Sequence, residues 1–413
     1  MEGHGVGLRL VVAIAMVFAI VLGAAGLPWA DAAVDAFSEG TRLLKAGQPR
    51  EAIPHFDRAL RLNPRQVETY NNRGAAYVKL GQRERAIQDY TKALRLDPRN
   101  VRAYNGRGIA YYNLGKMERA LQDFSEALRL NPRLAEAYSN RGAVHRNLGQ
   151  RKRAIQDYTK ALRLNPRQAE AYNNRGAAYV KLGQHKRAIQ DFSEALRLNP
   201  RGADAYYNRG VVYDDLGQHK RAIQDYTKAL RLNPRLPQAY YNRGVVYDDL
   251  GKRERAIQDY TEAIRFNPLY YAAYYNRGLA YSSLGRYERA IEDFNEVIGV
   301  NPRAADAYSG RGAARREQGD LAGAIADLDK AIEIDPRYAR AYGNRGLARL
   351  LQGKEVEAEK DFRNCFELDP KMRRAFEPRI KEAKAKRAGK PEGKPEKGTP
   401  SSPQQFLDNG PSR

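Results

Sequence analysis

Residues 169–202 read AEAYNNRGAAYVKLGQHKRAIQDFSEALRLNPRG. Aromatic and small residues recur three or four positions apart in each half of this stretch, which places them on one face of a helix. They are Tyr172, Gly176 and Tyr179, followed by Ala188, Phe192 and Ala195. Gly183 lies between the halves, and Pro200 pushes the residue before it out of helical geometry. The stretch therefore predicts two amphipathic helices joined by a short turn.

The same pattern occurs ten times, with a period of 34 residues and no insertion or deletion. The prolines that mark the period are Pro64, Pro98, Pro132, Pro166, Pro200, Pro234, Pro268, Pro302, Pro336 and Pro370. A fixed period of this length indicates a solenoid, in which each unit packs mainly on its neighbours. Solenoids present long binding surfaces, so binding is the expected role and catalysis needs evidence of its own.

Aromatic, glycine, alanine, aromatic, alanine and proline residues stay in register over residues 33–372, and in this the chain resembles the tetratricopeptide repeat family. The resemblance implies an all-α fold, a right-handed superhelical solenoid of antiparallel helix pairs whose first helices line an inner groove. The expected repeats are residues 33–66, 67–100, 101–134, 135–168, 169–202, 203–236, 237–270, 271–304, 305–338 and 339–372.

The C-terminal region is expected to differ from the repeats. A basic C-terminal capping helix is predicted at residues 373–388, with Pro378 as an alternative starting point for it. Residues 389–413 are rich in Pro, Gly, Ser and Lys and are expected to be disordered.

The N-terminal residues 1–32 predict export. Residues 10–27 carry no charge, and the small residues Ala30 and Ala32 fit a signal-peptidase site after Ala32. The alternative is an uncleaved membrane anchor formed by residues 10–27, because 18 apolar residues are just enough to cross a bilayer. Cleavage predicts a periplasmic or secreted protein, and both alternatives place the repeats outside the cytoplasm.

Nine units share a charged pair. Arginine precedes the first-helix glycine, where the family usually has an apolar residue, and aspartate precedes the second-helix aromatic. The first unit has Glu39 and His55 at these places, so both members change together. We predict nine partly buried Arg–Asp pairs. The alternative is a row of arginines that binds anions.

Seven units have an asparagine two residues before the first-helix glycine: Asn72, Asn140, Asn174, Asn208, Asn242, Asn276 and Asn344. An amide both donates and accepts hydrogen bonds, so such a row can hold a peptide backbone without reading its sequence. The alternative is that each asparagine bonds to an adjacent repeat and fixes the stacking. The two roles are compatible.

Repeats six to eight differ from the others in their first helices. Tyrosines precede the asparagine, at Tyr207, Tyr241 and Tyr275, and carboxylates follow two turns later, at Asp214, Asp215, Asp248 and Asp249. In a chain of net charge +23, this acidic and aromatic stretch predicts a site for an extended peptide segment that carries Lys or Arg and some apolar surface. The alternative is an ordinary solvated face.

We predict no catalytic or metal site and no cofactor. None of the five histidines has a second ligand candidate at metal spacing, and Cys365 occupies the slot of a packing alanine. The leading hypothesis is a non-catalytic scaffold that binds protein segments in a concave groove. The alternatives are a basic surface that binds anionic polymers, nucleic acid or membrane head groups, and a regulatory or targeting subunit of an enzyme complex. The expected export argues against nucleic acid.

Overall fold

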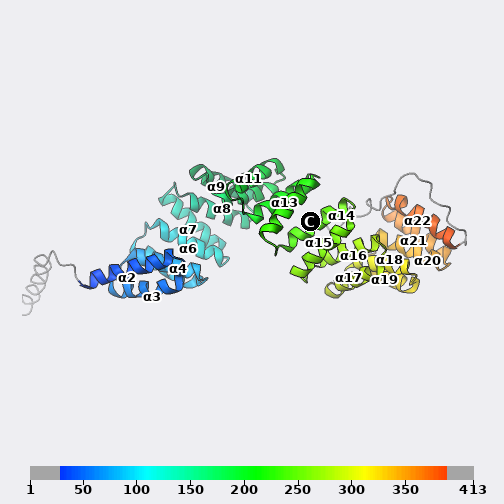
Figure 1. Ribbon diagram of the computed structural model, residues 1–413, viewed down its shortest axis with the longest axis horizontal. Helices are drawn as coiled ribbons and strands as arrows, with labels where there is room; N and C mark the ends of the chain where they lie inside the picture. The colour runs from blue at the N-terminus through cyan, green and yellow to red at the C-terminus, as the bar shows by residue number, and fades with distance from the viewer. Residues whose placement is uncertain (1–27, 388–413) are drawn as a thin grey trace, which may run out of the picture. The chain divides into compact units, whose positions relative to one another are not determined.

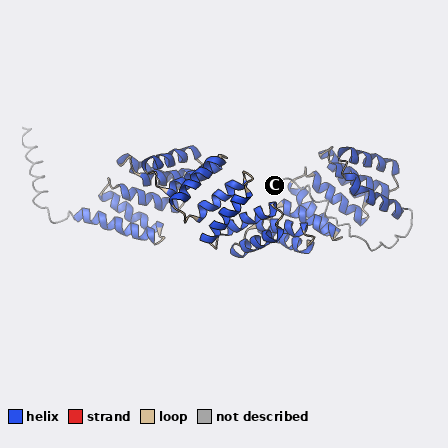
Figure 2. Cartoon of the chain, turned by 90° about the horizontal axis from the view of Figure 1, so that it is seen from above, coloured by secondary structure: helices blue, strands red, loops and turns tan. Residues whose placement is uncertain are grey.

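The computed structural model describes residues 28–387, whose only regular secondary structure is helical (Figure 1, Figure 2). The helices are α2 (Pro28–Lys45), α3 (Pro49–Leu62), α4 (Val67–Lys79), α5 (Arg83–Leu96), α6 (Val101–Asn113), α7 (Met117–Leu130), α8 (Ala135–Asn147), α9 (Arg151–Leu164), α10 (Ala169–Val180), α11 (His185–Leu198), α12 (Ala203–Asp215), α13 (His219–Leu232), α14 (Pro237–Asp249), α15 (Arg253–Phe266), α16 (Tyr271–Ser283), α17 (Tyr287–Val300), α18 (Ala305–Gln318), α19 (Leu321–Ile334), α20 (Ala339–Leu351), α21 (Glu355–Leu368) and α22 (Met372–Arg387). The all-α expectation is confirmed.

Each predicted repeat forms one pair of helices, from α2 and α3 in the first to α20 and α21 in the tenth. The helices divide into two compact units, α2–α11 and α12–α22. Within each unit, the second helix of a repeat packs on the first helix of the next one, as expected for a solenoid (Figure 1). In the second unit, α22 packs on α20 and α21 and covers the end of the stack.

The turn residues act as the sequence predicts. Gly183 ends the first half of its repeat with φ +69°, a left-handed conformation that glycine adopts without a steric penalty. At the end of α9, the Asn165 side-chain oxygen accepts a hydrogen bond from the Arg167 N–H at 3.1 Å. This bond and the following Pro166 close the helix.

The core of each repeat is an aromatic ring held between small residues. In the seventh repeat, Ala256 and Ala263 are fully buried and Tyr260 is almost so. A Cβ atom placed on Gly244 would lie 2.8 Å from the Tyr260 ring, so only glycine fits there without a shift. The small first-helix slot therefore lets the second-helix ring approach the first-helix backbone.

The structure places the first and last helices of the array at slightly different boundaries from the predicted ones. α2 begins at Pro28, so cleavage after Ala32 would fall within this helix and leave it starting at Ala33. The apolar residues 10–27 and the tail at 388–413 lie outside the described residues. Between residues 28 and 387, no helix combines the length and the apolar character needed to cross a bilayer. α22 starts at Met372 and contains Pro378, so the proline does not mark its start.

Candidate functional site

All nine predicted Arg–Asp pairs are present, and each is bidentate. In every pair the arginine Nε donates to one carboxylate oxygen at 2.7–3.0 Å, and Nη2 donates to the other at 2.6–2.9 Å. The pairs are Arg73–Asp89, Arg107–Asp123, Arg141–Asp157, Arg175–Asp191, Arg209–Asp225, Arg243–Asp259, Arg277–Asp293, Arg311–Asp327 and Arg345–Asp361. In the first repeat Glu39 instead pairs with Arg42 on the same helix.

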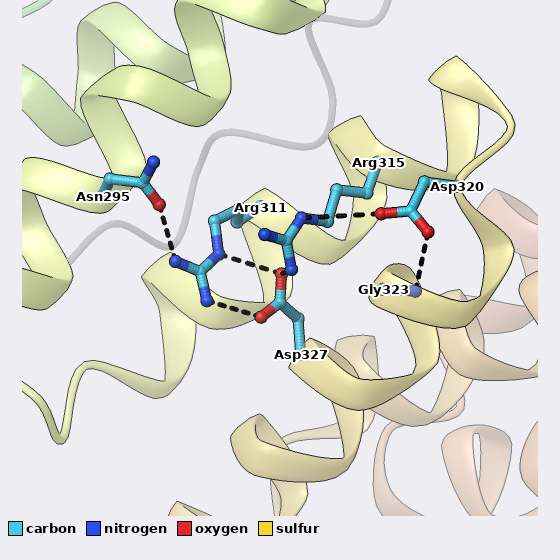
Figure 3. Close-up of polar contacts among 6 residues, drawn as sticks. All are labelled: Asn295, Arg311, Arg315, Asp320, Gly323 and Asp327. Carbon is cyan, nitrogen blue, oxygen red and sulfur yellow. Dashed lines mark hydrogen bonds and ion pairs between the residues drawn. The ribbon is translucent and has the colours of Figure 1, made fainter.

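Within the two units, eight of these arginines are also seen to reach a third helix, a contact that the sequence does not predict. The remaining nitrogen, Nη1, donates to a polar side chain on the second helix of the preceding repeat. Figure 3 shows the arrangement for Arg311, which joins Asp327 of its own repeat to Asn295 of the preceding one. The arginines therefore connect repeats within each unit, and their donors are occupied by protein acceptors rather than offered to a ligand.

The asparagine row also connects repeats. Amide nitrogens donate to the preceding repeat, for example from Asn140 to Asn105 at 3.2 Å and from Asn276 to the Tyr241 hydroxyl at 3.0 Å. The other recorded bonds are Asn72 to Thr41, Asn242 to Tyr207 and Asn344 to Ser309. Asn174 accepts from Arg146, and Asn208 is half-buried. Stacking is thus the role that these hydrogen bonds perform.

The three tyrosines of repeats six to eight are half-buried and take part in packing. Tyr207, Tyr241 and Tyr275 lie with ring centroids 5.8–6.0 Å from the second-helix aromatic of their own repeat. Tyr275 also lines a groove in the second unit.

The four aspartates divide into two classes. The Asp214 side chain is 6% exposed and its Oδ1 lies 3.4 Å from His219 Nδ1, whereas Asp215 is exposed. Asp248 is buried, with its Oδ1 3.9 Å from Arg253 Nε, and burial raises its pKa to about 6. Asp249 is exposed like Asp215. In both doublets the second aspartate is thus the more exposed one, because adjacent helix positions point in different directions.

The second unit contains a groove of about 440 Å³, which lies against α16, α18, α20 and α22. Its apolar lining includes Leu279, Ala313, Leu347 and Leu351 from the first helices of repeats eight to ten. The volume falls in the range of about 300–1,000 Å³ that is usual for ligand sites. Of the predicted site residues, Tyr275 and Asn344 line it. The first helices therefore form a concave face in this unit, as the resemblance implied.

Charged side chains around the groove are mostly paired. Arg316 donates to Glu317 at 2.5 Å and to Asn344 at 3.3 Å, and Lys386 lies 2.6 Å from Glu382. Arg379 on α22 is exposed, and in residues 28–387 no hydrogen bond or ion pair is recorded for it. Desolvation, together with the positive charges of Arg316 and Arg340, lowers the pKa of Arg379, although the charges of Glu317 and Glu382 oppose the shift. Sequence reasoning missed this cluster because its members come from different repeats and from α22.

The basic surface, the cysteine and the acidic side chains provide no further candidate site among the described residues. Arginines that open the second helices stack on first-helix tyrosines, as Arg221 does on Tyr213 at 5.5 Å, so part of the basic surface is engaged within the protein. Burial raises the pKa of Cys365 to about 11, so its thiol stays protonated near neutral pH. Over residues 28–387, no cluster of three His, Cys, Asp or Glu side chains is arranged to hold a metal ion.

Comparison with known proteins gives one recurring sequence signature. Signatures described as TPR repeat match residues 40–81, 76–115 and 144–183. Signatures described as tetratricopeptide repeat match residues 101–134, 169–201, 203–236, 241–299, 275–339 and 314–364. A search of curated proteins finds no matching sequence.

Several solved structures are partly similar. MamA is 28% identical, with 41% of this chain and 92% of that chain covered and a TM-score of 0.38. YrrB, described as a TPR protein with an unusual peptide-binding site, is 29% identical, and the match covers 43% of this chain and 92% of YrrB with a TM-score of 0.37. The Pseudomonas aeruginosa protein pilF is 21% identical, and the match covers 50% of this chain and 95% of pilF with a TM-score of 0.46.

Proposed function

Because the chain belongs to the tetratricopeptide repeat family, we propose that it is a non-catalytic interaction scaffold that binds extended protein segments along the inner face of its first helices. The observation that supports this most is the groove in the second unit, since the repeats contribute to it mainly through first-helix positions. An extended segment suits a surface of this kind, because the same slots recur once per repeat and can take successive side chains.

The positions that line the groove in repeats eight and nine have equivalents 34 and 68 residues earlier in the sixth and seventh repeats. Leu279 and Ala313 line the groove, and the equivalent positions are Val211 and Val245. Tyr207 and Tyr241 occupy the slot of Tyr275. The exposed carboxylates of Asp215 and Asp249 lie one turn beyond the valines. We propose that this surface prefers a segment that carries Lys or Arg next to apolar side chains.

Calorimetry with the full chain tests this preference. The probe is a synthetic 12-residue peptide that alternates Lys and Leu, and the reference peptide has Glu in place of Lys. We expect the Lys peptide to bind and the double variant Asp215→Lys/Asp249→Lys to lose at least about tenfold in affinity, because two attractive charges become repulsive. The matched control is Glu262→Lys on the second helix α15, which should bind as the unchanged protein does. If the double variant and the control bind the Lys peptide with equal affinity, the proposed preference of this surface is wrong.

We also propose that the repeats act outside the cytoplasm, on the strength of the apolar residues 10–27 and the small residues before Ala33. N-terminal sequencing of the protein purified from its native cells tests this. A mature protein that begins at Ala33 supports cleavage, and an intact N-terminus in the membrane fraction supports an anchor. A chain with its original N-terminus in the cytoplasmic fraction contradicts both.

A further inference from the structure

The groove of the second unit combines two chemistries. One part is apolar and consists of Leu279, Leu347 and Leu351. The other part is cationic, with Arg316, Arg340, Arg379 and Lys386 around it. Three carboxylates, Asp306, Glu317 and Glu382, line it as well, so the bases exceed the acids by one. Such a surface matches a ligand that places a large apolar side chain next to a carboxylate.

Arg379 is the group that a carboxylate would meet. Arg316 and Lys386 already have the acidic partners Glu317 and Glu382, whereas no hydrogen-bonded or ion-paired acceptor is recorded for Arg379 among residues 28–387. Its guanidinium carbon lies 6.0 Å from the centroid of the Phe376 ring on the same helix. Glu317 and Glu382 offset part of the repulsion that Arg379 meets from Arg316 and Arg340. A further carboxylate beside Arg379 would offset more of it and would accept two hydrogen bonds from the guanidinium.

The chain carries a segment of this chemistry. Residues 388–413, which lie outside the described residues, read AGKPEGKPEKGTPSSPQQFLDNGPSR. Phe406 and Leu407 are the only large apolar side chains in this tail, and Asp408 follows them directly. The remaining residues are mostly polar, charged, glycine or proline, so no other position offers an apolar pair beside a carboxylate.

The tail also starts in the right place. It follows Arg387, and α22 lines the groove from Met372 to Lys386. Arg387 lies eight positions after Arg379, which is about 12 Å along the helix at 1.5 Å per residue. The 18 residues between Arg387 and Phe406 have a root-mean-square span of about 25 Å if they behave as a flexible linker. The tail is therefore long enough to turn back along α22, and tethering supplies an effective concentration of about 1 mM.

We propose that the groove is a binding site for the tail of the same chain, with Phe406 and Leu407 against the leucines and Asp408 at Arg379. The tail then occupies the concave face at repeats eight to ten, and any external segment must displace it there. The proposal does not depend on the Lys-bearing ligand suggested for repeats six and seven, because it concerns a different part of the face and the opposite charge.

Fluorescence anisotropy with a labelled peptide of residues 400–413 tests the proposal. The peptide is titrated with the full chain and with the full-chain variant Phe406→Ser/Leu407→Ser, in which the groove should be vacated. We expect the variant to bind the peptide at least about tenfold more tightly than the unchanged chain, because the tethered tail competes in the latter. A peptide with Asp408→Asn should bind the variant about tenfold more weakly than the original peptide.

A second pair of changes locates the site. In the vacated variant, Arg379→Glu should abolish peptide binding, and Arg379→Gln covers the case in which the glutamate variant fails to fold. Arg374→Glu is the matched control, since Arg374 is exposed on the same helix but does not line the groove. Equal affinity for the unchanged and vacated chains overturns the proposal, and so does binding that survives both Arg379 variants. If the peptide binds neither the unchanged nor the vacated chain, the tail is not the occupant of the groove, and the proposal is overturned as well.

Discussion

Removal of one buried carboxylate should destabilise the array far more than removal of both charges of its pair. In the seventh repeat, Asp259 is 5% exposed and accepts two hydrogen bonds from Arg243, at 2.8 and 2.7 Å. Hydrogen bonds to charged groups contribute about 1.5–3 kcal/mol each, so Asp259→Ala removes about 3–6 kcal/mol of interaction. The Arg243 side chain is 16% exposed and keeps its bond to Thr227, so it can relax partly towards water. We expect a loss near the lower end, about 3 kcal/mol.

The double change Arg243→Leu/Asp259→Leu should recover most of that loss. Burial raises the pKa of Asp259 although the hydrogen bonds and charge of Arg243 oppose the shift, so desolvation offsets much of the attraction in the pair. Two apolar residues need no such desolvation, and replacement of a buried ion pair by apolar residues is often neutral or better. We therefore expect the double variant to lie within about 1 kcal/mol of the unchanged protein.

Urea unfolding followed by circular dichroism measures the change, and hydrogen exchange of α14 and α15 shows where it occurs, because a long repeat array need not unfold in one step. Glu262→Ala is the control, since it breaks an exposed pair with Arg265 on the same helix and should leave the unfolding midpoint unchanged. The reasoning is refuted if Asp259→Ala unfolds at the same midpoint as this control, or if the double variant is less stable than the single one.

Three further changes test the packing and the buried groups. Because the folded pKa of Asp248 is raised to about 6 from an ordinary 3.8, its contribution favours folding below pH 4 and is lost as the pH rises through 6. Asp248→Asn should thus stabilise the protein by up to about 3 kcal/mol at pH 7 and by nothing at pH 3, whereas Asp249→Asn should do neither in the same urea titrations. Gly244→Ala should cost about 1–3 kcal/mol in thermal or urea unfolding, because its Cβ would lie 2.8 Å from the Tyr260 ring. Cys365 should react with a maleimide at pH 7.5 only after unfolding, since it is fully buried and its thiol pKa is raised to about 11; rapid labelling of the native protein contradicts this.

The fold was predictable because the repeat makes one set of rules apply ten times. Gly183 and Pro166 mark helix ends by backbone geometry alone, and their counterparts recur at a fixed period. The Arg–Asp pairs were predictable because both members change together in the first repeat, at Glu39 and His55. The third contact of these arginines could not be predicted, since a residue such as Asn295 cannot be distinguished in the sequence from any polar residue on a solvated face.

The candidate site was harder to predict than the fold. Asp214 and Asp215 are neighbours in the sequence, yet one carboxylate meets His219 and the other is exposed, and only the packing of α13 decides which. The groove at repeats eight to ten depends on α22. Phe376 of this helix follows the 34-residue period from Tyr342 and packs against the tenth repeat, but the period does not predict that residues as far along the helix as Lys386 line the groove. The 34-residue period thus predicts which first-helix positions face inward, but not which of them line a groove.

The most direct test of the central claim is whether ligands cover the inner face. Peptides that bind the full chain are selected from a random 12-residue library, and maleimide labelling is then compared for Val245→Cys on the first helix α14 and Gln258→Cys on the second helix α15. Buried Cys365 serves as an internal background. We predict that bound peptide slows the labelling of position 245 at least about tenfold, as expected for a covered groove slot, and leaves position 258 unchanged. Protection of position 258 with position 245 still reactive would contradict the account.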